Sequence, residues 1–460
     1  MECVDVAVIG GGPAGASAGE AAAVAGAEVV VLEKGVPRSD RDAVGPDSTD
    51  AGGFLNYWLD IADIDYRNIP RDVILKELHG VRFIGPSEYV SFRTSAGERS
   101  SAPRFGFTFD RARFDDWLRD RAERAGAGYR VGARVAEVEA DLRGPNYVRL
   151  HDGHEIEAEH LVLADGPGRS VTVPTLDQFM PQGSDVVEYL GPRRANHIAY
   201  QEHRRMPNDV FDSHTISFWW GWVPGETAYI WVFPNDRNTA RIGLTMPMNL
   251  EANTVDEPSQ YRLLRAEEDH RPDGGEYVRR FLEEAYPRYD PSAFPIITDR
   301  GKSSGTESYP ISSTRPVDSP VRAKVAVVGG AMGTTSAFHE GGYHLAMRTG
   351  KIAGRLAGRG ELHRYNDAWK RAIGTEIVRN TAAGATVSGF GPAQWDRSLA
   401  TIDRLQRATS DPHPKHGGYL TWASAAGRTG IFLAARYAWH RYRLGGGKYV
   451  QLRESQYVYK

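Results

Sequence analysis

The chain has 460 residues, a formal net charge of -3 at pH 7 and a pI near 6.6, so its charge gives no argument for nucleic-acid binding. Its single cysteine, Cys3, excludes disulfides within the chain and thiolate metal clusters, and the scattered histidines lack metal-ligand spacing. No apolar run reaches the roughly 20 residues that span a bilayer, and no signal peptide precedes the first strand. We therefore expect a cytoplasmic protein of two or three lobes.

The N-terminal segment has the pattern of a dinucleotide-binding strand, turn and helix. An apolar run meets Gly10-x-Gly12-x-x-Gly15, and an alanine-rich stretch follows. In this pattern the first glycine allows the tight turn, the second lets the backbone approach a pyrophosphate, and the third lets the helix pack closely on the sheet. The positive end of the helix, at Pro13 and Ala14, then faces the phosphates.

Later segments continue this pattern. A second apolar run ends at Glu33-Lys34, where a carboxylate can accept hydrogen bonds from the adenosine ribose. A helix that includes Arg111 is expected after residue 109, and a buried strand ends in Asp165-Gly166. Residues 324–333 run from a strand into Gly329-Gly330, and a loop then leads through Gly341-Gly342 into a helix expected over 343–356.

In this order, the four segments resemble the FAD-binding architecture of aromatic hydroxylases, flavin-dependent halogenases and geranylgeranyl reductases. The resemblance implies a Rossmann-like, doubly wound α/β lobe that binds FAD, with an antiparallel-sheet substrate lobe and a helical C-terminal tail. It implies FAD contacts from Gly10, Gly12, Pro13, Ala14, Gly15, Glu33, Lys34, Arg111, Asp165, Gly166, Gly329, Gly330, Gly341 and Gly342.

The chain departs from the family pattern at Gly330. The family has Gly-Asp in this motif, with the acid bonded to a ribityl hydroxyl, whereas this chain has Gly329-Gly330, and Ala337 replaces a proline of the following loop. A hydrogen bond to a charged group contributes about 1.5–3 kcal/mol, so its loss would weaken FAD binding by about tenfold or more.

Four strands expected between 197 and 246 carry two aromatic motifs. Tyr229-x-Trp231-x-Phe233-Pro resembles the geranylgeranyl reductase signature whose aromatics line an isoprenoid tunnel, although Thr245 replaces the second glycine of the family's following Gly-x-Gly. The alternative is an ordinary core stripe on one sheet face. Trp219-Trp-Gly-Trp-Val-Pro partly matches a halogenase motif, while the one lysine near the expected place, Lys76, is better explained as a surface residue. Predicted substrate-binding residues are Tyr229, Trp231, Phe233, Trp220 and Trp222.

The loop from Ser336 to Gly342 is predicted to pass beside the flavin ring, where the following helix N-terminus stabilises reduced flavin. His339 and Glu340 lie in sequence where an acid could protonate a substrate carbon, although a structural role is the alternative for a single loop histidine. Geranylgeranyl reductases have a cysteine near Gly52-Gly53 and this chain has none. Asp50, with Asp47 and Ser48, is therefore a further candidate for the catalytic proton donor.

The tail from His416 to Lys460 contains seven Arg or Lys residues against one Glu, interleaved with tyrosines and tryptophans. Two explanations are open: a helix that packs over the substrate lobe, or a peripheral contact with anionic lipid headgroups. The predicted division is an FAD-binding domain over 1–180 and 300–380, a substrate domain over 181–299, and a helical region over 381–460.

We predict an FAD-dependent oxidoreductase that reduces carbon-carbon double bonds of an apolar, isoprenoid-like substrate. The alternative is a flavin monooxygenase or halogenase acting on a natural-product or aromatic substrate. NAD(P)H or another reductant would supply the electrons. The sequence does not identify which, because no second nucleotide motif marks a nicotinamide site.

Overall fold

The computed structural model describes residues 1–35, 52–93, 105–142, 144–190, 197–225, 227–248, 250–251, 255, 257–265, 272–301, 303–312, 314–410 and 418–459. Its first lobe is built on a seven-stranded sheet in the order β8-β2-β1-β11-β10-β9, with β17 also paired to β11. Strands β8, β2, β1, β11 and β17 run parallel, and β10 and β9 add an antiparallel edge. The strands are β1 Glu2–Ile9, β2 Val29–Leu32, β8 Gly128–Arg130, β9 Val135–Glu139, β10 Asn146–Leu150, β11 Glu155–Leu163 and β17 Val325–Val327.

Helices pack against this sheet, as expected for a doubly wound lobe. They are α1 Pro13–Val24, α3 Arg111–Arg124, α4 Thr172–Asp177, α5 Val187–Leu190, α7 Gly329–Met332 and α8 Tyr343–Ala357. The pair α1 and α8 packs backbone to backbone: a Cβ on Gly350 would lie 2.0 Å from the Ala14 carbonyl oxygen, and one on Gly354 would lie 2.0 Å from that of Ala18. Because no side chain fits there, the two helices approach as closely as their backbones permit.

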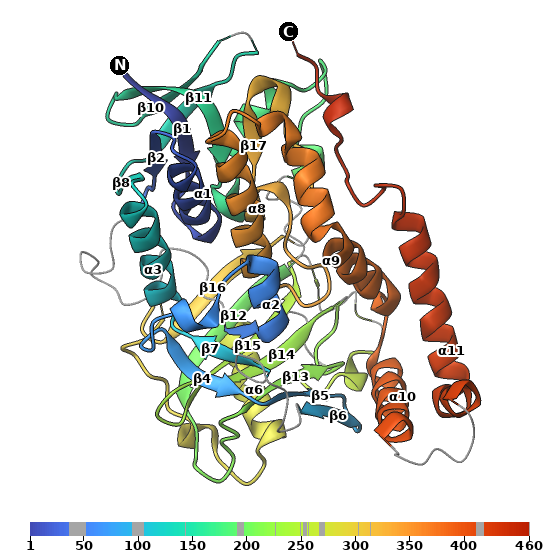
Figure 1. The fold of residues 1–460 in the computed structure, drawn as a ribbon. Coiled ribbons are helices and arrows are strands. Elements are labelled where there is room, and N and C mark those ends of the chain that lie inside the picture. The colour runs from blue at the N-terminus through green and yellow to red at the C-terminus, as the bar shows by residue number, and fades with distance from the viewer. Residues whose placement is uncertain are drawn as a thin grey trace.

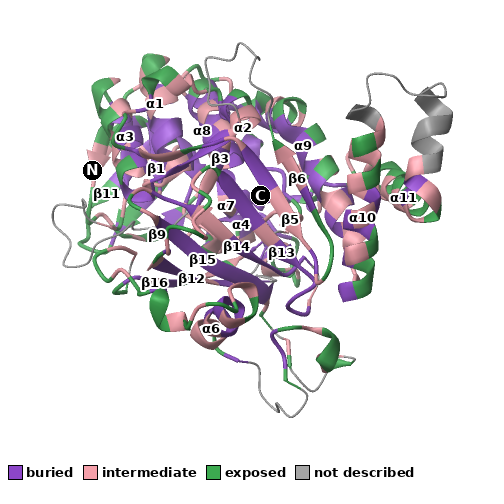
Figure 2. Cartoon of the chain, turned by 90° about the horizontal axis from the view of Figure 1, so that it is seen from below, coloured by how far each residue is buried: buried purple, intermediate pink, exposed green. Residues whose placement is uncertain are grey.

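The second lobe contains another seven-stranded sheet, in the order β16-β12-β15-β14-β13-β5-β6. Its pairs are antiparallel except β13 with β5. The strands are β5 Gly80–Ile84, β6 Tyr89–Arg93, β12 His197–Arg205, β13 Thr215–Trp220, β14 Tyr229–Pro234, β15 Thr239–Pro247 and β16 Thr306–Ile311. Helix α6, Gly274–Ala285, covers one face through Phe281 and Tyr277, and Figure 2 shows the purple, buried strands of this sheet behind it.

A small three-stranded sheet and the helix α2 lie between the lobes. Its order is β3-β7-β4, with β3 Gly53–Leu55, β4 Ile74–Leu78, β7 Gly106–Phe109 and the helix α2 Asn56–Ala62. Fully buried phenylalanines join this sheet to α3 and to Tyr343 at the start of α8: Phe54, Phe107, Phe109 and Phe114. Figure 1 shows the first sheet in the upper part of the molecule, the second below it, and α2 between them.

Three long helices form the C-terminal region: α9 Tyr365–Val387, α10 Pro392–Ser410 and α11 Gly418–Leu444, the last broken at Gly427. Helix α11 packs on α9 and α10 along one side of the molecule (Figure 1), and not over the second sheet. Beyond α11 the chain returns to the first lobe, where Leu452 pairs with Val317 and Tyr457 is buried. Among the described helices, none combines the length and apolarity needed to cross a membrane.

The observed sheets differ from the predicted domain boundaries in one respect. Residues 80–93 and 306–311 form β5, β6 and β16 of the second sheet, although the predicted division assigned them to the FAD lobe. Within the sheet, β16 pairs with β12, and β5 pairs with β13 and in turn with β6. Without these strands, β12 and β13 would be edge strands with unpaired backbone groups. Pairing between segments so far apart in the chain leaves no local pattern in the sequence.

Candidate functional site

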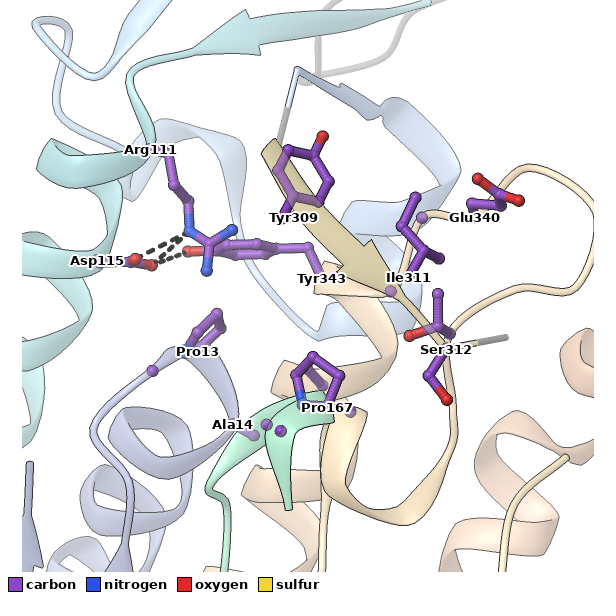
Figure 3. A pocket seen from close by; sticks show the side chains of 18 of the residues that line it. Pro13, Ala14, Arg111, Asp115, Pro167, Tyr309, Ile311, Ser312, Glu340 and Tyr343 are labelled. Atoms are coloured by element: carbon purple, nitrogen blue, oxygen red, sulfur yellow. Dashed lines mark hydrogen bonds and ion pairs between the residues drawn. The ribbon is translucent and has the colours of Figure 1, made fainter. Parts of the chain in front are cut away.

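One large cavity, of about 1140 Å³, extends from the turn after β1 to the aromatic face of the second sheet. Most of the predicted site residues line it, and Figure 3 shows Pro13, Arg111, Pro167, Ile311, Glu340 and Tyr343 around it. Both lobes contribute, so neither sheet alone forms the site. The cavity lining also includes Gly52 and Gly53, while Asp47, Ser48 and Asp50 lie outside the described residues.

The first-lobe end of the cavity has the geometry that the glycine pattern predicts. Gly10 has φ 98°, a conformation that L side chains rarely adopt, and a Cβ on Gly15 would lie 1.8 Å from the Gly10 carbonyl oxygen. Gly15 therefore lies outside the cavity lining and allows α1 to pack closely on β1. Gly12 differs, because a Cβ there would meet no described atom within 4 Å and would project into open space. The protein itself gives no packing reason for a glycine at residue 12.

At the first-lobe end of the cavity, Glu33 links the turn after β1 to the segment after β2. The N–H of Gly11 donates to its Oε2 at 2.6 Å, and the N–H of Gly35 donates to its Oε1 at 2.7 Å. A carboxylate has about four acceptor positions, so two remain for hydroxyl donors of a ligand. Lys34 also lines the cavity, and the Tyr129 hydroxyl closes the turn by donating to the Gly11 carbonyl at 2.5 Å.

In the middle of the cavity, Arg111 is held by a carboxylate and an aromatic ring. Its Nε lies 2.9 Å from Asp115 Oδ1, and its guanidinium lies 4.4 Å from the ring centre of Tyr343. The Tyr343 hydroxyl donates to the same Asp115 oxygen at 2.9 Å (Figure 3). Burial and the Asp115 charge raise the pKa of Tyr343 well above its ordinary value, so this hydroxyl stays protonated as a donor. The three residues fix a buried cation beside the N-terminus of α8.

The Asp165 side chain holds the backbone segment that follows the Asp165-Gly166 motif. Asp165 Oδ2 accepts the N–H groups of Val171 at 2.7 Å and Thr172 at 3.0 Å, which fixes the turn into α4. Gly166 has φ 73°, and its missing side chain leaves open space at the cavity wall. Both residues line the cavity.

Gly330 lies against the neighbouring Pro167. A Cβ on Gly330 would be 3.1 Å from Pro167 Cδ and 3.2 Å from Pro167 N, tighter than ordinary contact. Gly329, with φ 60°, lies behind the cavity wall and packs against Ala346 of α8. The buried Arg169 supports this turn, because its Nη2 donates to the Gly330 carbonyl at 3.1 Å. Thus Pro167 leaves little room for the aspartate that the family pattern has at residue 330.

The loop before α8 brings His339 and Glu340 to the cavity wall. The Gly341 N–H donates to His339 Nδ1 at 3.2 Å, so the ring proton sits on Nε2. Burial, followed by the Arg379 charge, lowers the pKa of His339 to about 4, so the ring is neutral at neutral pH. Gly341 and Gly342 line the cavity immediately before the α8 N-terminus.

Glu340 adopts an unusual backbone conformation. Its φ is 57°, in the left-handed region that costs an L residue roughly 1–2 kcal/mol. The side chain is only 2% exposed, and its Oε1 contacts His197 Nδ1 on β12. Backbone strain of this kind concentrates at functional sites, because packing must compensate for it elsewhere. Glu340 is the one carboxylate among the described lining residues at the aromatic end.

The aromatic stripe of β14 forms the wall of the second-lobe end. Tyr229, Trp231 and Phe233 line the cavity, while Ile230 between them packs into the opposite core against α6. The predicted strand alternation is therefore confirmed. Tyr229 and Trp231 are also nearly fully buried, so they belong to the core and to the cavity wall together. Additional aromatic lining comes from Phe83, Phe218, Trp220, Tyr309 and Phe338.

Trp222 does not join this wall, in contrast to the prediction. It packs in the core beneath α6, where its Nε1–H donates to the Gly85 carbonyl at 3.0 Å. Gly221 has φ 75° and follows the last residue of β13, so the strand alternation that would place Trp222 beside Trp220 ends there.

Several lining residues were not predicted from the sequence. Trp58 of α2 lies at the cavity wall with its ring stacked on His344 at 4.3 Å, and Tyr309 and Ile311 come from β16. Arg379 and Asn380 reach the cavity from α9. The run Tyr309-Pro-Ile311 has an aromatic strand pattern that could have indicated β16. Nothing in the sequence around Trp58 or Arg379 distinguishes them from ordinary helix residues.

The described residues fit an FAD molecule in this cavity. Gly12 leaves open space beside the α1 N-terminus, where a pyrophosphate binds in this type of turn, and Glu33 retains acceptor capacity for a ribose. At the other end, buried polar atoms of four lining residues have no hydrogen-bond partner among the described residues: Trp58 Nε1, Trp231 Nε1, His339 Nε2 and Glu340 Oε2. Buried polar groups are normally satisfied, so unpartnered atoms around one cavity indicate a polar ligand there.

The Gly12 position offers a direct test of the cofactor site. We expect Gly12→Ala to leave the melting temperature of the FAD-free protein unchanged but to weaken FAD binding at least tenfold, because the new Cβ enters space that only a ligand fills. Gly15→Ala is the matched control, and its Cβ clash with Gly10 should lower the melting temperature of the FAD-free protein. Flavin fluorescence titration and thermal unfolding measure both effects. Unchanged FAD affinity in Gly12→Ala would contradict this placement.

The comparisons with known proteins agree with this geometry. Residues 5–90 match the FAD binding domain family. The chain is 26% identical over 415 residues to digeranylgeranylglycerophospholipid reductase 2 of Methanopyrus kandleri, a match that covers 87% of this chain and 90% of the relative.

Two solved structures extend the comparison to the fold. A geranylgeranyl bacteriochlorophyll reductase-like protein from Thermoplasma acidophilum has a TM-score of 0.67 at 21% identity, covering 96% of this chain and 100% of that one. A myxobacterial chondrochloren halogenase has a TM-score of 0.58 at 16% identity, covering 94% of this chain and 98% of that one. The predicted FAD-binding fold and the resemblance to geranylgeranyl reductases and halogenases are confirmed.

Proposed function

We propose that the protein is an FAD-dependent oxidoreductase that saturates carbon-carbon double bonds in a long apolar, isoprenoid-like substrate. The observation that carries this proposal is the continuity of one cavity from the dinucleotide turn to an aromatic-lined chamber. Reduced FAD, when bound, supplies the hydride. The protein supplies the apolar chamber, the orientation of the chain within it and a proton.

The chamber has the chemistry of a site for a hydrocarbon chain. Its walls are aromatic and aliphatic side chains from β5, β13, β14 and β16, and its charged groups lie mainly toward the first lobe and the α9 edge. Apolar walls gain free energy by burying an apolar chain, at about 25 cal/mol per Å² of apolar surface removed from water. The relative from Methanopyrus kandleri, by its name, is a reductase of a digeranylgeranyl lipid, which supports an isoprenoid substrate class.

The cavity lining favours reduction over halogenation. Among the described residues that line it, the only lysine is Lys34, at the nucleotide end, and Lys76 lies on β4 outside the lining. A halogenase needs a lysine at the substrate end to handle hypohalous acid. NAD(P)H or another reductant supplies the electrons in this proposal.

Product mass separates the two chemistries. Purified protein with FAD, a chemical reductant and candidate prenyl lipids should yield products that have gained two hydrogens per reduced bond, with oxygen excluded. A strict oxygen requirement, with an oxygen or halogen atom in the product, would instead identify an oxygenase or halogenase.

Trp231 tests whether the aromatic wall handles substrate. We expect Trp231→Ala to raise KM for a prenyl lipid about tenfold or more and to leave the flavin spectrum intact, because the ring lines the chamber beside Phe233. Trp219→Ala is the control on the opposite sheet face, where Trp219 packs 4.8 Å from the Phe281 ring centre. This control should lose about 3–5 kcal/mol of unfolding free energy with unchanged turnover per folded molecule. The same result for Trp231→Ala would show that its ring is only core.

We further propose that α11 makes a peripheral contact with an anionic membrane surface. Its exposed large side chains are Ile431 (54%), Phe432 (57%), Trp439 (56%) and Tyr442 (78%), which helical spacing places along one face. Exposed arginines 428, 441 and 443 accompany this face. The helix is anchored to the end of α9, because Arg436 Nη2 donates to the Ser388 carbonyl at 2.9 Å. Aromatic side chains flanked by arginines are typical of helices that bind anionic headgroups.

Vesicle binding tests this contact. The wild-type protein should co-sediment with vesicles that contain phosphatidylglycerol, more weakly with pure phosphatidylcholine, and less as salt rises. Phe432→Glu with Trp439→Glu should abolish most of the binding, whereas Tyr89→Glu, at an exposed residue of β6, should not. Equal binding by all three proteins would exclude α11 as the contact.

A further inference from the structure

The contact between Glu340 and His197 joins the cofactor loop to the second sheet. Glu340 precedes Gly341-Gly342 and the α8 N-terminus, while His197 is the first residue of β12. Glu340 Oε1 contacts His197 Nδ1, and the two side chains are 2% and 3% exposed. Thr245 of β15 lies near the same ring atom, with its Oγ1 3.1 Å from His197 Nδ1. A carboxyl group and an imidazole thus meet in the interior, at the edge of a cavity.

Only Glu340 of this pair lines the cavity, beside Ile311 in Figure 3. Apart from the contact of Oε1 with His197, neither carboxyl oxygen has a hydrogen-bond partner among the described residues. His197 lies behind it, between β15 and β16. The carboxyl group therefore faces the cavity, and the imidazole lies behind it with both Glu340 and Thr245 at its Nδ1.

The other titratable groups at this end are poorer proton donors. Burial and Arg379 lower the pKa of His339, so its ring is neutral at neutral pH and is not an imidazolium acid. Burial, followed by the Glu340 charge, raises the pKa of Tyr229, whose hydroxyl already donates to the His339 carbonyl at 2.9 Å. Tyr309 from β16 is a phenol, and phenols are weaker acids than carboxylic acids. Farther along the cavity, Asp115 and Asp165 are engaged by Arg111 and by the α4 backbone.

We infer that Glu340 is the acid that protonates the substrate carbon, and that His197 is a positioning residue that orients this carboxyl group and returns a proton to it. The inference rests on the proposed function. It deepens that function by naming the proton donor and a residue that acts through it.

The step balances without a further reactant. Saturation of the double bond adds a hydride equivalent to one carbon and a proton to the other. Reduced FAD supplies the hydride equivalent when it is bound. The O–H bond of the Glu340 carboxyl breaks as the new C–H bond forms, which leaves a carboxylate. The Nδ1–H of the His197 imidazolium then passes its proton to Oε1, and solvent protonates the imidazole again. Each turnover restores both residues.

Kinetics separates proton donation from packing. Glu340→Gln should lower kcat about 100-fold or more, since general acids contribute on that scale. His197→Phe keeps the ring volume and should lower kcat at least tenfold with little change in KM. His197→Asn places an amide N–H donor close to the position of Nδ1, so this variant should recover part of the kcat that His197→Phe loses. The alkaline limb of its kcat-pH profile should differ from that of the wild type. His203→Phe is the matched control, because His203 is buried on the same strand and does not line the cavity.

Proton NMR of the protein without FAD or substrate gives a second readout. We expect a downfield imidazole N–H resonance that disappears in His197→Phe, shifts upfield in Glu340→Gln and stays in place in His203→Phe. Wild-type kcat and pH profile in His197→Phe, or a resonance indifferent to Glu340→Gln, would overturn the inference. A wild-type protein that shows the resonance but reduces no prenyl lipid would defeat the proposed function alone, so the two failures are distinguishable.

Discussion

Glycines let the backbones of α1, α8 and the turn after β1 approach one another closely. The helix α1 touches its own strand turn through Gly15 and touches α8 through Gly350 and Gly354. These contacts bring the N-terminal ends of α1 and α8 to the wall of one cavity. Helix N-termini carry a partial positive charge, so the two ends provide favourable surroundings for a pyrophosphate and for a reduced flavin ring. A methyl group at Gly350 or Gly354 would force α8 away from α1, and one at Gly15 would force α1 away from the turn after β1.

The second sheet adds an aromatic wall to this cavity, which makes its second-lobe end suitable for an apolar substrate. The strand β14 has two different faces: Ile230 belongs to the core under α6, and its neighbours Tyr229 and Trp231 form the chamber wall. One strand therefore stabilises the lobe and shapes the site at the same time. This explains why the stripe could be taken for core from the sequence and still lines a cavity.

Local periodicity predicted the elements well, because the β1 turn, the β12–β15 meander and α8 each have patterns that a few consecutive residues carry. The sequence did not reveal which segments would cover the sheet edges, so β5, β6 and β16 were assigned to the wrong lobe. Trp222 was misplaced for a related reason, since the φ of 75° at Gly221 ends the alternation and depends on tertiary packing. The Glu340 contact with His197 likewise exists only after the two lobes meet.

Two departures from the family pattern have a structural counterpart. At residue 330, Pro167 occupies the space beside the glycine, which leaves little room for the family's aspartate. Arg169 holds this turn by donating to the Gly330 carbonyl. At residue 245, where the resemblance leads one to expect glycine, the threonine hydroxyl lies against His197. That histidine contacts Glu340, whose left-handed backbone places a carboxyl group directly before the α8 N-terminus. A chain without the family's cysteine thus has a buried acid at the same cavity, with its own supporting residues behind it.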